Sequence, residues 1–511
     1  MRLIPSAWAS ACMYLSRPNG RPSACWTHSI SAGAAPNPRE HRGARPFEAI
    51  PSTGDHGWLN LYHLWKTDGF FNRHQAMTEN FNRLGPIYRE KLGGKESINI
   101  FQPDDIAVLF RSEGLFPKRM LLDSWVAHRD YRNHKCGIFL KNGEVWRSER
   151  LVLNKEVISP SAVSKFSPLV EPVVLHFTDF VEQEMAAGRW QTEFNMLPNL
   201  FRLSLESSFH LLYGERLGLF AEEVDPSSER FIQAVEEMLQ TTIPLLYIPL
   251  ELAKWLNMKP WRDHVAAWDF LFEHADQCFR QLLLRLQNVP EGKRQYLGII
   301  PELIHQSKLP IDIIKANSVE LMVGSVETTA HTLLFTLFEL ARNPSIQAAL
   351  RDEVTTAYSQ AQGDVCKLMS SVPLLRAAIK ETLRLYPIGV TLQRYPAHDI
   401  VIQNYHIPAG TMVTAGLYTM GRSPEIFPQP ERYNPARWLT SDRNYFQAVN
   451  FGFGLRQCIG RRVAETEIGI FLIHILRKFR IVTKSEADLK LFYGFIVMVD
   501  DPPLLAFRPI H

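Results

Sequence analysis

The chain has 511 residues, a hydrophobic fraction of 46%, a charged fraction of 21% and a formal net charge of +3. This composition is that of a globular protein with a sizeable core, and the charge does not call for a nucleic acid partner. Six cysteines lie far apart, with no C-x-x-C pair, which excludes a disulfide scaffold and a zinc module. These are Cys12, Cys25, Cys136, Cys278, Cys366 and Cys458.

Residues 1–40 differ in composition from the rest. They are rich in Ser and Ala and contain several arginines, but no acidic residue precedes Glu40. This pattern predicts a mitochondrial transit peptide, with cleavage between residues 20 and 45. A secretory signal and a tail without targeting function are the alternatives, and the apolar run at 7–14 is too short to span a membrane.

Residues 41–511 predict one catalytic domain, mainly α with a small β region (α+β). Apolar spacing predicts long helices in most of this part, and a proline-rich irregular stretch between the last two of them. The expected helices are 164–187, 229–242, 264–286, 312–342, 344–361, 373–386 and 462–478, and the expected strands are 98–101, 400–403, 411–414 and 494–498.

The predicted helix 312–342 breaks a local rule at Gly324, Glu327 and Thr328, because glycine and a Thr pair weaken a helix interior. Such a break indicates a functional groove or close packing of a partner element. Further on, Glu381 and Arg384 form E-x-x-R on one helical face.

The stretch from Phe451 to Gly460 reads F-x-x-G-x-R-x-C-x-G. Its glycines allow the backbone to approach a flat cofactor, Arg456 can grip a carboxylate, and Cys458 can supply an axial sulfur to haem iron. A buried structural cysteine in a Gly-rich turn is the alternative. With this spacing the chain resembles the cytochrome P-450 family over nearly all of residues 45–511.

The resemblance implies the cytochrome P-450 fold, with haem b (iron protoporphyrin IX) between the helix carrying Gly324 and the Cys458 loop. It implies that Glu327 and Thr328 relay protons during oxygen activation, and that Arg432 completes a buried network with Glu381 and Arg384. Phe451, Arg456, Trp146, Arg150 and Arg394 are the expected haem contacts.

The blocks Trp125–Leu140, Phe338–Pro344 and Asn404–Thr411 resemble the mitochondrial steroid 11β-hydroxylase and aldosterone synthase group. A rigid apolar steroid needs aromatic and aliphatic walls. The residues expected to line the pocket by this resemblance are Trp125, Arg129, Phe139, Glu320, Val323, Thr328, Phe495 and Ile496. Val323 replaces the small residue usual in the family, and Glu327 stands where Asp is more frequent.

The implied activity is a ferredoxin-dependent monooxygenase that hydroxylates 11-deoxycortisol or 11-deoxycorticosterone at carbon 11. Electrons would come from NADPH through a reductase and a 2Fe-2S ferredoxin, which would dock at Arg376 and Lys380, with Arg461 and Arg462 extending the patch. A solvated helix face is the alternative for these cations. The implied location is the matrix side of the mitochondrial inner membrane.

Aromatic residues beside lysines in 243–261 suit either peripheral membrane contact or a lid over the substrate channel. For the activity, the sequence leaves open a cholesterol side-chain-cleaving or vitamin D type hydroxylase. A haem-thiolate isomerase and a haem sensor without oxygenase activity also remain.

Overall fold

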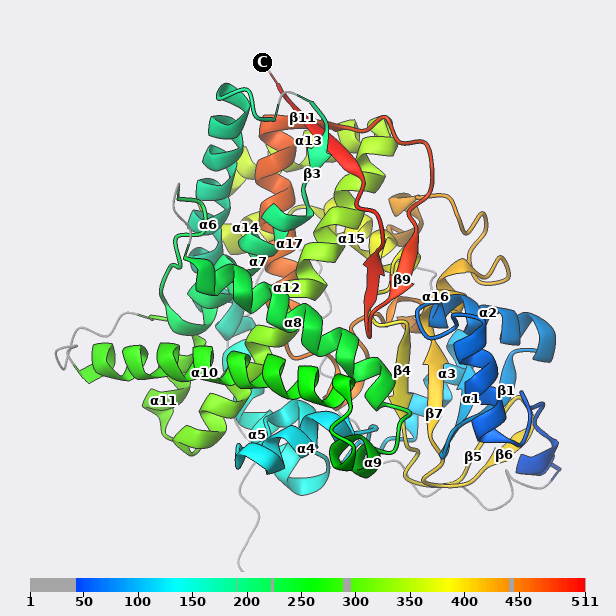
Figure 1. Cartoon of the computed structure of the whole chain (residues 1–511). Helices are drawn as coiled ribbons and strands as arrows, with labels where there is room; N and C mark the ends of the chain where they lie inside the picture. Colours follow the sequence, from blue (N-terminus) through cyan, green and yellow to red (C-terminus); the bar gives the residue numbers. More distant parts are fainter. Residues whose placement is uncertain (1–42, 191, 222–224, 288–295, 441–444, 511) are drawn as a thin grey trace, which may run out of the picture. The chain divides into compact units, whose positions relative to one another are not determined.

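In this computed structural model, residues 43–510 are described apart from 191, 222–224, 288–295 and 441–444. The predicted transit peptide at 1–40 lies outside the described residues. Helices make up most of residues 43–510, with a smaller β region beside them (Figure 1). The predicted α+β class is confirmed.

Seven helices form where the apolar periodicity predicts them, with bounds shifted by a few residues. Prolines begin several of them, because proline fits the first helical turn. The side chain of Ser159 also caps one of these helices by accepting the backbone N–H of Ala162 at 3.1 Å. These helices are α6 (Pro160–Ala186), α8 (Pro226–Leu245), α10 (Lys259–Gln287), α12 (Ile311–Arg342), α13 (Pro344–Ala361), α15 (Pro373–Leu385) and α17 (Arg461–Lys478).

Further helices lie outside the predicted ranges, and most of them are short. The longest is α7 (Leu197–Tyr213), which is buried on nearly every side. The others are α1 (Gly57–Lys66), α2 (Arg73–Leu84), α3 (Pro103–Arg111), α4 (Asp123–Arg132), α5 (Gly143–Val157), α9 (Leu250–Trp255), α11 (Ile299–Gln306), α14 (Val365–Ser370) and α16 (Leu417–Arg422).

The main sheet has four strands in the order β1-β2-β7-β4, with β2 and β7 parallel and the other pairs antiparallel. It packs with α1, α2 and α3 on one side of the helical part (Figure 1). Three small sheets pair β5 with β6, β9 with β10, and β11 with β3 and β8. The strands are β1 (Ile87–Leu92), β2 (Lys95–Ile100), β3 (Phe194–Asn195), β4 (Thr391–Arg394), β5 (Ile400–Ile402), β6 (Tyr405–Ile407), β7 (Val413–Gly416), β8 (Phe479–Val482), β9 (Leu491–Tyr493), β10 (Val497–Val499) and β11 (Leu504–Pro509).

The long helix α12 is the axis of the core. It packs on α7, α8, α10, α15 and α17, and almost every residue from 329 to 341 is buried. By length and composition it could cross a membrane, but 78% of its apolar window is buried inside the protein. It is therefore a core helix, and it holds Gly324 and Thr328 at a fixed place in the fold.

Candidate active site

The Cys458 loop is a tight backbone structure that ends where α17 begins. Gly452 and Gly454 take φ values of 72° and 69°, which strain any residue with a Cβ. The Cys458 N–H donates to the Phe451 carbonyl at 2.7 Å, and the thiol remains exposed. Desolvation by the surrounding protein raises the pKa of this thiol. The Gly460 N–H, Arg150 and Arg461 act in the opposite direction, because they stabilise the thiolate. The loop presents a single sulfur, as expected for an axial ligand.

Gly324 is exposed in the middle of the otherwise buried helix α12, and a Cβ placed there would meet no atom within 4 Å. Thr328 follows one turn later, and its hydroxyl donates to the Gly324 carbonyl at 2.9 Å. Gly324 and Thr328 thus mark one side of α12 that borders open space. A flat ligand or a small molecule can approach the helix backbone on this side.

Glu327 lies on a different side of the helix from that open space. It is buried, neither carboxylate oxygen has a hydrogen-bond partner among the described residues, and the neutral His331 lies 3.4 Å away. Burial, assisted by Glu236, raises the pKa of Glu327 to about 8. Glu327 is therefore mostly protonated at neutral pH and can act as a proton store. No hydrogen bond joins it to Thr328, so the predicted relay between them stays a prediction.

Four arginines converge near the Cys458 loop. Arg119, Arg150, Arg394 and Arg456 come from a loop, from α5, from β4 and from the 3-10 turn 454–456, and their charges act on one another. Burial, together with the other guanidinium groups, lowers the pKa of Arg456 to about 8 and that of Arg119 to about 10.

Among the residues that the structure describes, one buried carboxylate forms an ion pair with this cluster: Glu113 pairs with Arg394. Arg456 instead donates to the carbonyls of Pro117 and Lys141 at 2.6 and 2.5 Å, and its guanidinium lies 4.1 Å from the ring centre of the buried Trp146. An uncompensated group of buried cations requires an anionic ligand. The two propionates of haem b fit this requirement.

Arg150 joins the cluster to the Cys loop itself, since it donates to the Gln457 carbonyl at 2.7 Å. The sequence identified Trp146, Arg150, Arg394 and Arg456 but missed Arg119. No spacing in the sequence marks Arg119, because its loop reaches β4 through long-range contacts such as the bridge between Lys118 and Tyr395.

Three aromatic residues expected to contact substrate do come together. The Trp125 ring stacks on Phe139 at 5.4 Å between ring centres and lies 6.0 Å from Phe495. Phe495 takes a φ of 72°, an uncommon value for a bulky residue, in the tight turn between β9 and β10. The three rings form an aromatic wall from α4, the 3-10 turn 138–140 and the β9–β10 turn.

Other expected pocket residues lie around this wall. Val323 and Ile496 are buried. Arg129 is fully buried with its guanidinium 3.6 Å from the ring centre of Trp268, and two of its nitrogens have no partner among the described residues. The Glu320 carboxylate accepts two backbone N–H groups of the 137–139 segment, so it binds this segment to α12.

The predicted role of Arg432 is wrong. Glu381 is buried and binds Arg384, but the second arginine is Arg437, whose Nε lies 2.9 Å from Glu381 Oε1. Arg432 is exposed, its side chain donates to Gln429, and only its carbonyl faces Arg384. The turn at Gln429, with a φ of 50°, and the 3-10 helix Pro435–Trp438 bring the later arginine inward.

The predicted docking cations lie on one exposed patch. Arg376 and Lys380 are exposed on α15. Arg461 and Glu465 of α17 lie close enough to Lys380 to shift its pKa, in opposite directions. Arg461 and Arg462 both pair with Glu465, at 2.8 and 3.0 Å. The patch adjoins the helix that follows Cys458.

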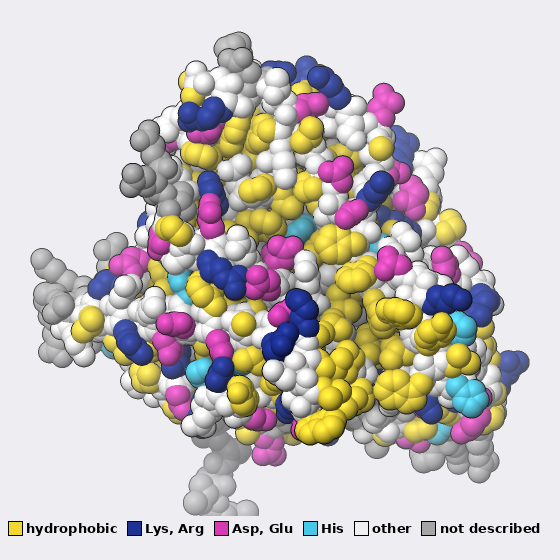
Figure 2. Space-filling view, in the orientation of Figure 1, with side chains coloured by type: hydrophobic (Ala, Val, Ile, Leu, Met, Phe, Trp, Pro, Cys, Tyr) yellow, Lys and Arg dark blue, Asp and Glu magenta, His cyan; other side chains and the backbone are white. Residues whose placement is uncertain are grey.

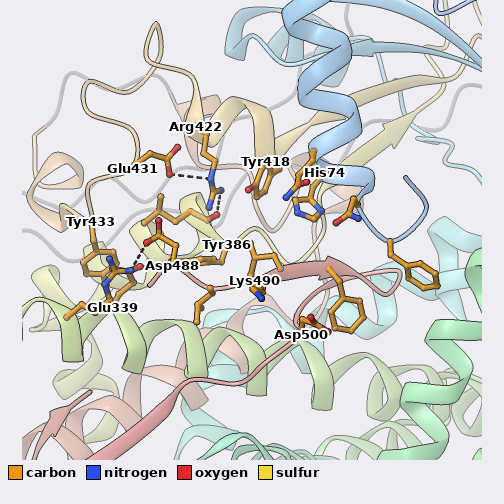
Figure 3. Close-up of a pocket in the computed structure, with 18 of the residues that line it drawn as sticks. His74, Glu339, Tyr386, Tyr418, Arg422, Glu431, Tyr433, Asp488, Lys490 and Asp500 are labelled. Carbon is orange, nitrogen blue, oxygen red and sulfur yellow. Dashed lines mark hydrogen bonds and ion pairs between the residues drawn. The ribbon is translucent and has the colours of Figure 1, made fainter. Parts of the chain in front are cut away.

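A groove of about 1030 Å³ opens elsewhere (Figure 3). None of the residues that line it belongs to the Cys458 loop or to Gly324–Thr328. Arg422 pairs with Glu431 at 3.5 Å and Arg342 with Asp488 at 2.8 Å, and Arg432 lines the same groove. The candidate site is therefore the space beside Cys458 and Gly324, and not this groove.

Comparison with known proteins gives the same assignment over almost the whole chain. The model of the family described as Cytochrome P450 matches residues 51–507. "Cytochrome P450 11B, mitochondrial" of Aquarana catesbeiana is 50% identical over 509 residues, which cover 98% of each chain. "Cholesterol side-chain cleavage enzyme, mitochondrial" of Oncorhynchus mykiss is 44% identical over 96% of each chain. "Cytochrome P450 11B1, mitochondrial" of Ovis aries is 41% identical over 99% of each.

Proposed function

This chain belongs to the cytochrome P450 family, and we propose that it is a mitochondrial steroid 11β-monooxygenase acting on 11-deoxycortisol or 11-deoxycorticosterone. Members of the family bind haem b. The observation that carries the proposal is the 50% identity to a P450 11B enzyme over 98% of both chains. The wall of Trp125, Phe139 and Phe495 supports it, because a steroid has large flat apolar faces.

Haem b bound through Cys458 would supply the oxygen chemistry. The residues of the chain would bind and orient the two reactants. Arg119, Arg150, Arg394 and Arg456 would hold the propionates, with Trp146 beneath Arg456. The exposed backbone at Gly324 would leave room for oxygen, and the aromatic wall would present one steroid carbon to it.

Protons would come from α12. The Thr328 hydroxyl borders the open space, whereas the protonated Glu327 is buried one residue earlier. Since no direct hydrogen bond links the two side chains, a bridging water would be needed to pass a proton between them.

The second candidate is cholesterol side-chain cleavage, favoured by the 44% identity to the enzyme of Oncorhynchus mykiss. The discriminating experiment incubates the holoenzyme, ferredoxin, its reductase and NADPH with 11-deoxycortisol, 11-deoxycorticosterone and cholesterol in parallel. We expect 11-hydroxylated products from the first two steroids. Turnover of cholesterol alone would overturn the proposal, and turnover with hydroperoxide alone would indicate an isomerase.

The electron donor is proposed to be a 2Fe-2S ferredoxin, reduced by an NADPH-dependent reductase. The exposed cations Arg376 and Lys380, with Arg461 and Arg462 beside them, support an acidic protein partner. Arg461 and Arg462 begin α17, the helix that follows the sulfur ligand, and Arg461 is near enough to Lys380 of α15 to lower its pKa.

Residues 1–40 are proposed to direct the protein to the mitochondrion, and the enzyme is proposed to lie on the matrix side of the inner membrane. The arginines and the lack of an acidic residue before Glu40 support the first point, as do relatives that are named mitochondrial. Mass measurement of the mature protein from mitochondria tests it, and an intact N-terminus would contradict it.

Exposed apolar residues support the membrane contact. Trp255 at the end of α9 is 80% exposed beside Leu252 and Leu256, and α1 exposes Trp58 and Trp65. Figure 2 shows hydrophobic side chains gathered on this face around α9 and α1. The substitution Trp255→Glu should weaken binding to anionic lipid vesicles, and unchanged flotation with vesicles would contradict the contact.

A further inference from the structure

Three consecutive backbone amides of the 137–139 segment are bound to α12 by side chains. The Gly137 N–H donates to Glu320 Oε1 at 2.8 Å, and the Phe139 N–H donates to Glu320 Oε2 at 2.8 Å. Between them the Ile138 N–H donates to Asn317 Oδ1 at 2.9 Å. The segment is thus fastened to a helix about 180 residues later in the chain.

The two acceptors are themselves fixed in place. The Asn317 amide donates to the Ile313 carbonyl at 2.8 Å, which sets the orientation of its oxygen. A Cβ on residue 137 would lie 2.4 Å from Glu320 Oε2, so the carboxylate sits where only glycine leaves space. The contact is therefore specific to the residues present at 137, 317 and 320.

This attachment determines where the Phe139 ring lies. The ring stacks on Trp125 at 5.4 Å, the Arg119 guanidinium lies 3.8 Å from its centre, and 37% of Phe139 remains exposed. Part of the ring is thus available to a ligand. The hydrogen bond to Glu320 sets the position of Phe139 along the axis of α12, one turn before Gly324.

The other half of the aromatic stack is fastened to different helices. Trp125 Nε1 donates to Thr242 of α8 at 2.8 Å, and His128 of the same helix α4 lies 2.9 Å from Asp269 of α10. The Phe139 N–H is therefore held by α12 and its carbonyl by the Arg119 side chain, whereas Trp125 is held by the helices α8 and α10.

We propose that Glu320 and Asn317 are positioning residues that fix the Phe139 wall relative to Gly324 and Thr328, and so determine which carbon of the steroid is oxidised. The inference rests on the proposed function for its substrate, but the attachment itself can be measured without any substrate. Glu320 acts through the 137–139 backbone, and its role is not that of a catalytic residue.

The test combines residue-resolved amide hydrogen exchange with product analysis. In Glu320→Gln one acceptor oxygen is replaced by an NH₂ donor, so one of the two amides at residues 137 and 139 loses its acceptor and should exchange about tenfold faster. The exposed Asp312→Asn on the same helix is the matched control and should leave exchange at these amides unchanged. In Asn317→Ala only residue 138 should lose protection.

In the reconstituted system, the Glu320→Gln and Asn317→Ala variants should form a smaller fraction of 11-hydroxylated steroid and a larger fraction of products oxidised at neighbouring carbons. Asp312→Asn should keep the wild-type distribution. Unchanged exchange in Glu320→Gln would overturn the attachment, and lost protection with an unchanged product distribution would overturn the positioning role. If the wild-type enzyme forms no 11-hydroxylated steroid, the proposed function fails, whereas the exchange result still decides the attachment.

Discussion

Replacement of Arg437 by Ala should destabilise the protein far more than replacement of Arg432. Glu381 is fully buried and receives Arg384, Arg437, the Asn434 N–H at 2.9 Å and the Trp438 indole at 2.8 Å. Removing one member of such a buried ionic network costs about 3–5 kcal/mol. The exposed Arg432 contributes only a side-chain contact with Gln429, so Arg432→Ala should cost no more than about 0.5 kcal/mol.

Urea denaturation of the holoenzyme measures this difference. A loss of about 3–5 kcal/mol is a large part of the 5–15 kcal/mol typical of folded proteins, and it should lower the urea midpoint by roughly 1 M. Arg432→Ala is the matched control, because it removes the same side chain five residues earlier. Equal midpoints for the two variants would refute the assignment of Arg437 to the network.

Three further predictions concern Thr328, the buried Glu467 of α17, and Lys380. Thr328→Ala should lower product per NADPH at least about tenfold and divert electrons to peroxide, whereas Thr328→Ser keeps the hydroxyl; wild-type coupling in the Ala variant would exclude the relay. Burial raises the pKa of Glu467 from 4.5 to about 8, so the native state retains a proton that the unfolded state loses, and stability falls as pH rises through this range. Glu467→Gln should therefore gain urea resistance relative to wild type at pH 9 but not at pH 4, and an equal gain at both would contradict the shift. Lys380→Glu should raise the KM for ferredoxin about tenfold, while the exposed Lys490→Glu, in the groove of Figure 3, should not; equal effects would contradict the docking patch.

The sequence predicts seven of the long helices, and these include α12, which carries Gly324 and Thr328, and α17, which begins just after Cys458. It misses α7, where the buried polar residues Ser204, Glu206, Ser207 and Ser208 interrupt the apolar pattern. Local motifs also predict the site residues Cys458, Gly324 and Thr328, because each motif lies within about ten consecutive residues.

Residues that reach the site through long-range packing are harder to predict. Arg119 joins the arginine cluster through long-range contacts of its loop, among them the pairing with Tyr395. Arg437 takes the place predicted for Arg432 because it lies in the 3-10 helix Pro435–Trp438, which packs on α15 beside Glu381. The anchoring role of Glu320 depends on a backbone segment that lies 183 residues away from it in the chain.

The central claim is that the Cys458 sulfur is the protein ligand of the haem iron. The carbon monoxide difference spectrum of the reduced protein, recorded for wild type and for Cys458→Ser, tests it most directly. We expect the wild type to show the red-shifted Soret band of a thiolate-bound haem, and the Ser variant to lose both this band and steroid turnover. A variant with the wild-type spectrum and activity would contradict the account.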